Sequence, residues 1–184
     1  MDLINFQKVK DGKYLKNYEL TYLNKSGKEK VFEIVSHREL VGIEDLGNTP
    51  SGVSIIAIYN GKMLLLREFR MGVNRYIYNL CAGMIEKNES LEDCIRRELY
   101  EETGLHLKEI KKILPPSFAA VALSDITTHI AFAEVYGEFA DYSSDNEQIV
   151  ANFYTQEEVK ALLETEAFSS RAQLAAYFFA YYGF

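Results

Sequence analysis

The sequence predicts a mixed α/β domain built in layers, and three features indicate this fold class. Strand-like runs fill most of residues 13–80, a well-delimited helical pattern occupies residues 90–103, and the residues after Thr155 are again helical. Strands on both sides of a central helix, followed by terminal helices, are typical of helices packed on a sheet. With 184 residues, the chain is long enough for one well-buried core and a small appendage.

The expected strands before the central helix include two hairpins. The runs KYLKNYELTYL and KVFEIVS flank the polar connector NKSGK, which predicts two strands between Lys13 and Ser36. Residues 37–51 are expected to form a linker that ends in the turn signal NTPSG. In the clearer second hairpin, VSIIAIY and KMLLLREF are joined by Asn60-Gly61, the strongest short hairpin signal. The run YIYNL is a further strand candidate.

After the central helix, the pattern predicts two more strands and two helices. ITTHIAFAEVYG and IVANFY read as strands, whereas ILPPSF is expected to be a break. Thr155 and Glu158 form a capping-box pattern ahead of VKALLETE. Ser169 or Ser170 is expected to start the last helix, RAQLAAYFFAYY, whose aromatic stripe suits a core or dimer contact.

Composition excludes several classes of partner. The net charge of -7 argues against a bulk attraction to nucleic acid or to an anionic membrane. Cys81 and Cys94 form neither a disulfide framework nor a C-x-x-C metal site, so a reduced compartment is expected. The N-terminus lacks the form of a signal peptide, and the apolar run LAAYFFAYYGF is too short to span a bilayer. We therefore expect a soluble cytoplasmic protein.

Three glutamates are crowded onto one face of the central helix. Glu98, Glu101 and Glu102 stand at positions i, i+3 and i+4, which share a face at 3.6 residues per turn. Like charges so placed repel by about a few tenths of a kcal/mol per pair. Taken alone, such a stripe is more often a solvated face. The alternative is a cation site, because Mg²⁺ and Mn²⁺ prefer carboxylate oxygens.

The same helix carries clear start, stop and packing signals. Ser90 is the expected N-cap, with Asp93 as the acid of a capping box, and Gly104 stands where a left-handed cap ends a helix. An apolar row that should pack on a sheet is formed by Leu91, Ile95 and Leu99.

Neighbouring residues bear on the glutamate cluster. Arg97 precedes Glu101 by four residues and can pair with it or orient it. Ahead of the helix, Ala82-Gly83 is expected to make a turn that allows close approach to a ligand. The carbonyl oxygens of that turn would be available to a hard cation.

The stretch from Gly83 to Leu105 resembles the Nudix box, G-x5-E-x7-R-E-U-x-E-E-x-G-U with U apolar. Agreement holds at every fixed position: Gly83, Glu89, Arg97, Glu98, Leu99, Glu101, Glu102, Gly104 and Leu105. The resemblance implies the Nudix fold, an α/β/α sandwich with a mixed sheet. It also implies hydrolysis of a nucleoside diphosphate linked to another group.

Flanking segments resemble the ADP-ribose pyrophosphatase group of this family. LLLREFRMGVNRYIYNLCAGMIE is similar to its pattern R-Q-Y/F-R followed by E-L-P-A-G, and SSDNEQIVANFYTQEEV to its acidic loop. Residues 1–45 resemble its small exchanged β element, which implies a homodimer, and residues 46–184 would be the Nudix hydrolase domain. Asn79 replaces the usual Glu and Cys81 the usual Pro, so these two departures put the substrate in doubt.

The resemblance also assigns metal-site roles. Glu98 and Glu102 are expected to be direct ligands together with the Ala82 carbonyl, and Glu101 a further ligand or one acting through water. Two more acidic residues would reach in from the 141–148 loop, and one of them would bind metal or act as general base: Glu147 and Asp145.

Other residues would orient the metal-binding helix or contact substrate. Glu89 and Arg97 are expected to orient the helix. Arg67 and Arg70 have a fork geometry that suits phosphate oxygens, and they are expected to leave their strand toward the site. Residues next to the substrate would include Asn79 and Gly83.

The leading functional hypothesis is Mg²⁺-dependent hydrolysis of ADP-ribose to AMP and ribose 5-phosphate, with Mn²⁺ as an alternative metal. Another nucleotide sugar or a dinucleotide is the rival within the enzyme class. A non-catalytic ADP-ribose sensor and an interaction module with an acidic helix are the other classes. The expected partner is a small nucleoside diphosphate derivative, with no nucleic acid and no membrane.

Overall fold

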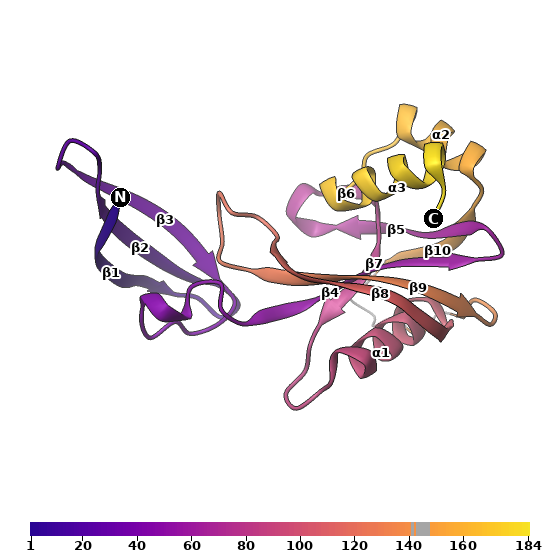
Figure 1. Cartoon of the computed structure of the whole chain (residues 1–184), viewed down its shortest axis with the longest axis horizontal. Coiled ribbons are helices and arrows are strands. Elements are labelled where there is room, and N and C mark those ends of the chain that lie inside the picture. The colour runs from indigo at the N-terminus through magenta and orange to yellow at the C-terminus, as the bar shows by residue number, and fades with distance from the viewer. Residues whose placement is uncertain (141, 143–147) are drawn as a thin grey trace. The chain divides into compact units, whose positions relative to one another are not determined.

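The computed structural model describes residues 1–140, 142 and 148–184 (Figure 1). The chain divides into two compact units. The first contains residues 1–51 and 116–128, and the second contains residues 52–115 and 129–184. Among the described residues, no helix is long and apolar enough to cross a membrane.

The first unit contains a three-stranded antiparallel sheet in the order β1-β2-β3. The strands are β1 (Asp2–Asp11), β2 (Lys16–Leu23) and β3 (Glu29–Ser36). The two predicted strands correspond to β2 and β3, whereas β1 was not predicted. Its sequence, DLINFQKVKD, is mostly polar and exposed, and it is held by a few contacts such as the stacking of Phe6 on Tyr18 at 5.1 Å.

Residues 37–49 include the short 3-10 helix η1 (Ile43–Asp45), and residues 116–128 complete this unit. Val35 N donates to Leu123 O at 2.8 Å. The small core of the unit consists of Tyr18, Leu20, Ile34 and Leu40.

Seven strands form a mixed sheet, in the order β10-β5-β4-β9-β8. Two short strands lie off this path, because β6 pairs with β5 and β7 pairs with β4. The bounds are β4 (Pro50–Tyr59), β5 (Lys62–Arg70), β6 (Arg75–Asn79), β7 (Cys81–Met84), β8 (His106–Phe118), β9 (Thr127–Tyr136) and β10 (Ile149–Tyr154). A 3-10 turn, η2 (Met71–Val73), links β5 to β6.

The expected break at ILPPSF is wrong. Strand β8 runs without interruption through Pro115 and Pro116 to Phe118. Proline is tolerated here because β8 is the last strand in the sheet order, and an edge strand does not need every N–H for pairing. In an edge strand, prolines such as these therefore do not mark where the strand ends.

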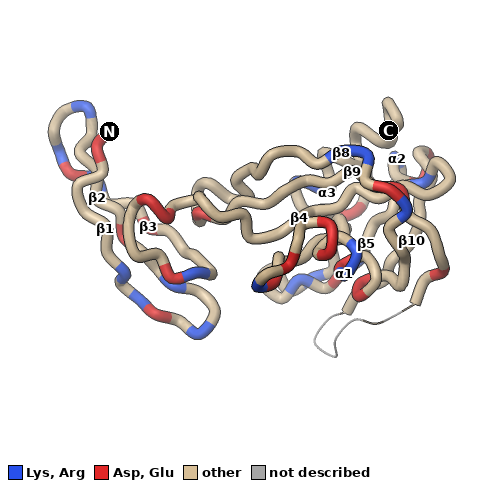
Figure 2. Tube along the Cα trace, turned by 60° about the horizontal axis from the view of Figure 1, so that its bottom comes forward, with Lys and Arg blue, Asp and Glu red and all other residues tan. Residues whose placement is uncertain are grey.

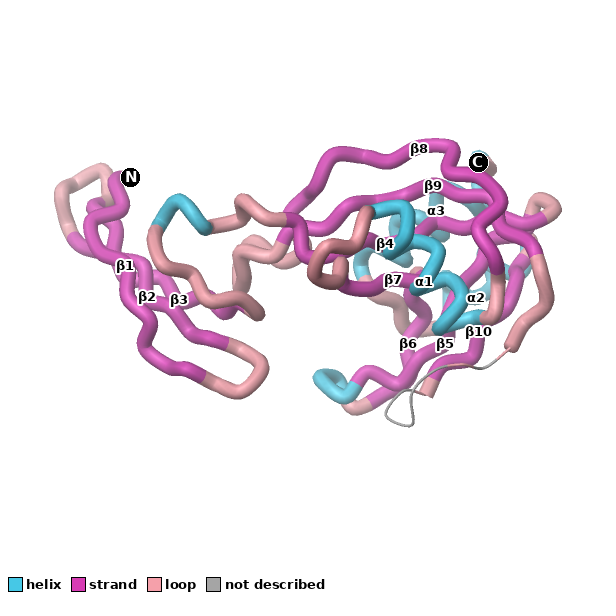
Figure 3. Tube along the Cα trace, turned by 90° about the horizontal axis from the view of Figure 1, so that it is seen from below, coloured by secondary structure: helices cyan, strands magenta, loops and turns pink. Residues whose placement is uncertain are grey.

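Helices cover both faces of the seven-stranded sheet, as Figures 1 and 3 show. Helix α1 (Leu91–Thr103) lies on one face, and α2 (Gln156–Thr165) and α3 (Ser170–Tyr182) lie on the other. Successive side chains of β5 point to opposite faces of the sheet and so belong to two different cores. Leu64 and Leu66 pack on the α1 side, and Met63 and Leu65 pack on the side of α2 and α3. The predicted α/β/α sandwich is confirmed.

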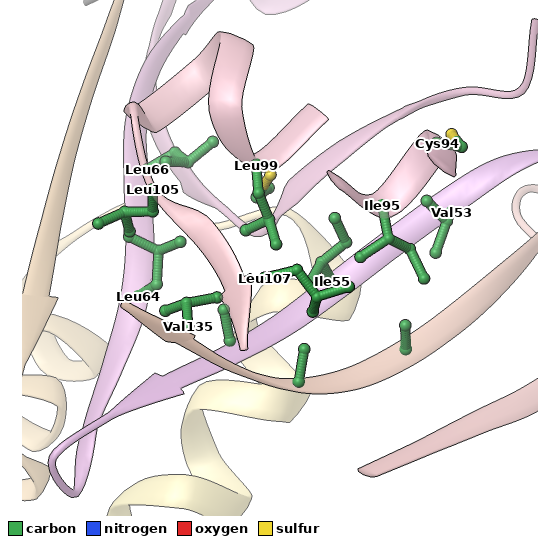
Figure 4. Packing of buried hydrophobic residues seen from close by; sticks show 14 residues of the cluster. Val53, Ile55, Leu64, Leu66, Cys94, Ile95, Leu99, Leu105, Leu107 and Val135 are labelled. Carbon is green, nitrogen blue, oxygen red and sulfur yellow. The ribbon is translucent and has the colours of Figure 1, made fainter. Parts of the chain in front are cut away.

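The predicted N-cap and C-cap of α1 are confirmed, whereas Asp93 does not complete the capping box, because its Oδ2 accepts from Ser90 Oγ and not from the Ser90 N–H. Ser90 Oγ accepts from Asp93 N at 3.1 Å, and Gly104 adopts a left-handed conformation with φ of 76°. A Cβ at Gly104 would come within 2.5 Å of Ala140 N, so glycine is required there for space as well as conformation. Ile95 and Leu99 are fully buried, and Figure 4 shows both packed among the sheet residues.

The caps of the two C-terminal helices are also confirmed. Thr155 and Glu158 form the predicted capping box at the start of α2. Ser169 is the N-cap of α3 and accepts from Ala172 N. These caps fix where the helices begin against the sheet.

Candidate metal and phosphate site

The three glutamates of α1 differ in exposure. Glu98 is buried, Glu102 is half-buried, and the side chain of Glu101 is 51% exposed. Helix α1 packs against β7, and Figure 2 shows acidic and basic residues gathered around this helix. Glu98 and Glu102 are therefore held toward the sheet, and Glu101 lies nearer to solvent.

Ala82 and Gly83 do not form the predicted turn. They belong to β7, where Ala82 is paired with Ser54 and Gly83 with Val53. Extended backbone forms here because β4 offers its edge over residues 52–55, while farther along β4 pairs with β5. The group that lies close to Gly83 is a side chain of the protein: a Cβ on Gly83 would overlap the carboxyl group of Glu98.

The backbone of Ala82 faces Glu102. Ala82 N donates to Glu102 Oε2 at 3.1 Å. In a strand, the N–H and C=O of one residue point to the same side, so the Ala82 carbonyl also faces the α1 side of this edge. One strand thus presents an N–H and a C=O next to the two least exposed glutamates of the cluster.

Arg97 connects the glutamates of this region. Its Nε and Nη2 donate to the two carboxylate oxygens of Glu89 at 2.8 and 3.0 Å. Its Nη1 donates to Glu98 at 2.7 Å and to Glu101 at 3.0 Å, the latter being the predicted i, i+4 pair. Nη2 also donates to Met84 O at 2.9 Å, which ties α1 to the end of β7.

The pKa values of the glutamates are shifted in different directions. Burial raises the pKa of Glu98, and the hydrogen bond from Arg97 partly opposes the rise. Burial raises the pKa of Glu102 to about 8, against opposing hydrogen bonds from Cys81 and Ala82 N. By contrast, Arg97 lowers the pKa of Glu89 to about 2. Burial thus disfavours the carboxylate forms of Glu98 and Glu102, and a cation bound beside them would favour these forms.

The donor set fits a hard divalent cation in chemistry. Glu98 and Glu102 lie one helical turn apart with raised pKa values, and the Ala82 carbonyl faces the same side, so a cation would supply the missing positive charge. Within the part of the chain that the structure describes, no three His, Cys, Asp or Glu side chains converge as a ready-made metal site. Further ligands would have to come from water, substrate or another segment.

Gly83→Ala is expected to displace the Glu98 carboxyl without unfolding the protein. The new Cβ would occupy the place of that carboxyl group, which is the movable end of a long side chain. We expect a loss of about 1–3 kcal/mol in the free energy of unfolding and a loss of Mg²⁺ affinity of about tenfold or more. Titration calorimetry with Mg²⁺ and urea unfolding measure the two effects. An unchanged affinity would contradict the assignment of Glu98.

The raised pKa of Glu102 predicts how stability depends on pH. A carboxyl whose folded pKa of about 8 exceeds its usual 4.5 favours folding in its protonated form. That contribution is complete below pH 4.5 and is lost as pH rises through 8, by on the order of 2–4 kcal/mol. Urea unfolding in EDTA from pH 5 to 9 should therefore show falling stability. Glu102→Gln should make the decrease of stability with pH smaller, and the part of the decrease that is due to Glu98 should remain. An equal decrease in both proteins would contradict this prediction.

The predicted phosphate-binding arginines are not brought together. Strand alternation places Arg67 on the face of Met63 and Leu65, where its guanidinium stacks over Tyr76 at 4.3 Å from the ring centre. Arg70 lies on the opposite face of β5, the α1 side, and its Nε is 3.5 Å from Glu68 Oε1. Only Arg70 shares a face with the glutamates of α1.

Glu68 is a site residue that the sequence reasoning missed. It is buried on β5, and its Oε1 accepts from Asn79 Nδ2 at 2.7 Å. Asn79 Oδ1 in turn accepts from Ser169 Oγ at 2.6 Å. The alternation of Leu64, Leu66 and Glu68 could have placed it on the buried face. The contact with Ser169, 90 residues further along the chain, has no signal in the sequence.

Two predicted site residues, Asp145 and Glu147, lie outside the described residues. The residues around them are placed: Tyr142 stacks on Tyr100 of α1 at 4.7 Å between ring centroids, and Gln148 accepts from the Tyr76 hydroxyl at 2.8 Å. Tyr142 therefore lies beside α1 and Gln148 beside β6.

The chain is similar to known pyrophosphatases in sequence. It is 29% identical over 137 residues to the ADP-sugar pyrophosphatase of Mus musculus, covering 72% of this chain and 60% of that protein. It is 31% identical over 122 residues to the ADP-ribose pyrophosphatase of Bacillus subtilis (strain 168), covering 66% and 57%. The aligned part of the chain thus spans less than two thirds of the length of either relative.

The fold is similar to that of a crystal structure described as an ADP compounds hydrolase, with a TM-score of 0.74 and 20% sequence identity. The match covers 95% of this chain and 89% of that one. The NUDIX domain profile matches residues 48–177, which include β4 to β10 and all three helices except the last residues of α3. This chain therefore belongs to the NUDIX domain family.

Proposed function

We propose that this protein is a Mg²⁺-dependent pyrophosphohydrolase that cleaves ADP-ribose, or a closely related ADP-sugar, to AMP and a sugar phosphate. The observation that carries the proposal is the pair of Glu98 and Glu102, two carboxylates whose pKa values are raised by burial, beside the edge of β7. The ADP-sugar and ADP-ribose pyrophosphatases among the relatives support the substrate class. Mn²⁺ is the alternative metal.

The residues that would hold the metal are Glu98, Glu102 and the Ala82 carbonyl, with Glu101 nearer to solvent. When bound, a divalent cation supplies charge neutralisation of the pyrophosphate and activation of a water. Arg97 fixes the Glu98 carboxylate by a 2.7 Å hydrogen bond and so maintains its orientation.

The remaining roles concern phosphate binding and proton transfer. Arg70 is the arginine that shares a face with the acidic cluster, and its side chain is 58% exposed, so its guanidinium can contact phosphate oxygens. We assign the general base to Glu147 or Asp145, which lie outside the described residues; a carboxylate can take a proton from the attacking water.

A substrate panel with product identification tests the function. The purified protein is incubated with Mg²⁺ and ADP-ribose, other ADP-sugars, a guanine nucleotide sugar or a nicotinamide dinucleotide, and products are separated by chromatography. We expect AMP from the ADP-sugars, fastest from ADP-ribose, and little product in EDTA. Tight ADP-ribose binding without turnover at any metal concentration would overturn the proposal in favour of a sensor.

For residues 1–45 we propose a role in homodimer formation. The sheet of β1 to β3 leaves apolar side chains exposed, among them Ile4, Val9 and Val31 at 48%, 49% and 54%. Exposed aliphatic side chains on a small sheet are suited to an interface with a second copy. Light scattering of the full chain is expected to give twice the mass of the chain, and a monomer mass at assay concentration would contradict the proposal.

A further inference from the structure

Buried Glu68 and half-buried Asn79 form a carboxylate–amide pair on the α1-facing side of the sheet. The side chain of Glu68 is 8% exposed, and its Oε1 is 2.7 Å from Asn79 Nδ2. The orientation of the Asn79 amide follows from its partners: its nitrogen donates to a carboxylate, and its oxygen accepts from the Ser169 hydroxyl at 2.6 Å. A flipped amide would set its oxygen against the carboxylate, so this arrangement holds Glu68 in one position.

The held carboxylate engages Arg70. Arg70 Nε is 3.5 Å from Glu68 Oε1, the same oxygen that Asn79 contacts. The structure records no other partner for the Arg70 guanidinium among the described residues, and the side chain is 58% exposed. Because the ion pair is made through Nε, the two Nη groups of the exposed guanidinium remain available to contact phosphate oxygens.

Comparison with the R-Q-Y/F-R and E-L-P-A-G pattern reveals a reciprocal change. This chain has Glu68 where the pattern has Gln, and Asn79 where the pattern has Glu. The two positions are in direct hydrogen-bond contact. One carboxylate and one amide therefore stand at these two positions in both arrangements.

We propose that Glu68 is a positioning residue that has taken over the carboxylate of position 79 and directs Arg70 to the substrate phosphates. The inference rests on the proposed function, which it deepens. The replacement at position 79 is compensated by Glu68, so the charge of the site is kept.

An exchange experiment tests the pair. Glu68→Gln and Asn79→Glu are made singly and together, with Glu134→Gln, a surface carboxylate that pairs with Lys108 and Lys111, as the control. Steady-state kinetics with ADP-ribose are measured for each protein. We expect each single variant to raise KM about tenfold with kcat changed less than about threefold, because the phosphate contact is weakened rather than the chemistry. The double variant should return KM to within about threefold of the original protein, and the control should not change it.

Two results would overturn the inference. One is a Glu68→Gln variant with unchanged KM. The other is a double variant in which the single effects multiply instead of cancelling, because independent sites add in free energy. If Glu68 had only a structural role, the variants would lose stability without a rise of KM at nearly constant kcat. Urea unfolding of all variants measures the loss of stability.

If Asn79→Glu does not fold, a second cycle tests the same link. Arg70→Lys removes the fork, and it should raise KM in the original protein but add little in the Glu68→Gln background. If the effects of Arg70→Lys and Glu68→Gln on KM were fully additive in free energy, the inference would be overturned. If the original protein hydrolyses no nucleotide sugar, the proposed function fails separately. ADP binding, measured by calorimetry, then tests the role of Glu68. Weaker binding by Glu68→Gln that recovers in the double variant supports the inference, and unchanged binding by Glu68→Gln overturns it.

Discussion

Glu102→Gln is expected to lower Mg²⁺-dependent turnover of ADP-ribose by about 10³-fold, equivalent to about 4 kcal/mol of transition-state stabilisation. Glu102 lies between α1 and β7, where its Oε2 accepts from Ala82 N and burial raises its pKa. A glutamine keeps the size and the acceptor oxygen for Ala82 N, but it removes the negative charge that a divalent cation requires. The loss should therefore be chemical and not structural.

Two measurements separate chemistry from folding in this experiment. Because the neutral form of residue 102 is favoured by burial, the metal-free variant should be at least as stable as the original protein at pH 8. Glu92→Gln is the matched control, since Glu92 lies on the same helix and forms only an exposed pair with Arg96. Near-normal Mg²⁺-dependent activity in the Glu102 variant would disprove the ligand assignment.

The parts of the site that could be predicted from the sequence are those set by local rules. The extent of α1 follows from Ser90 and Gly104, and its buried face follows from the spacing of Ile95 and Leu99. The ion pair of Arg97 with Glu101 follows from i, i+4 spacing. Each of these depends on residues within one or two helical turns, so no knowledge of the sheet was needed.

The parts that could not be predicted depend on strand pairing. The Ala82-Gly83 segment became a strand because β4 had a free edge, and Pro115 was tolerated because β8 lies at the end of the sheet order. Arg67 and Arg70 lie on opposite faces because they are three residues apart, and side chains alternate between faces along a strand. Sequence reasoning therefore located the acidic helix better than the strands that face it.

Long-range contacts explain why Glu68 could not be predicted as a site residue. Glu68 was overlooked because a single charged residue at the end of a strand usually reaches solvent. Its burial is tolerated because Asn79 donates to it and Arg70 lies nearby, and Asn79 is itself held by the N-cap of α3. Such a network is visible only when β5, β6 and α3 are assembled.

Arg97→Ala is expected to be the most destabilising change among the charged residues of α1. The arginine is bound to Glu89, Glu98 and Glu101, and it also donates to Met84 O. Its removal leaves Glu98, whose side chain is 11% exposed, buried without its cation. Breaking such a pair by removing one partner should cost about 2–4 kcal/mol of the free energy of unfolding in metal-free protein at pH 7. Turnover should fall by about 10²-fold, since Glu98 loses its fixed orientation.

The pH dependence of this loss gives a sharper test than its size. The pKa of Glu89 is lowered to about 2 by Arg97, so the stabilisation from that pair is present above the usual value of 4.5 and is lost as pH falls through 2. The difference in stability between Arg97→Ala and the original protein should therefore shrink steadily below pH 4.5 in urea unfolding. Arg96→Ala, which removes an exposed pair on the same helix, should change stability by less than about 0.5 kcal/mol at any pH. A difference for Arg97→Ala that stays constant down to pH 2 would show that packing, and not charge, is what Arg97 contributes.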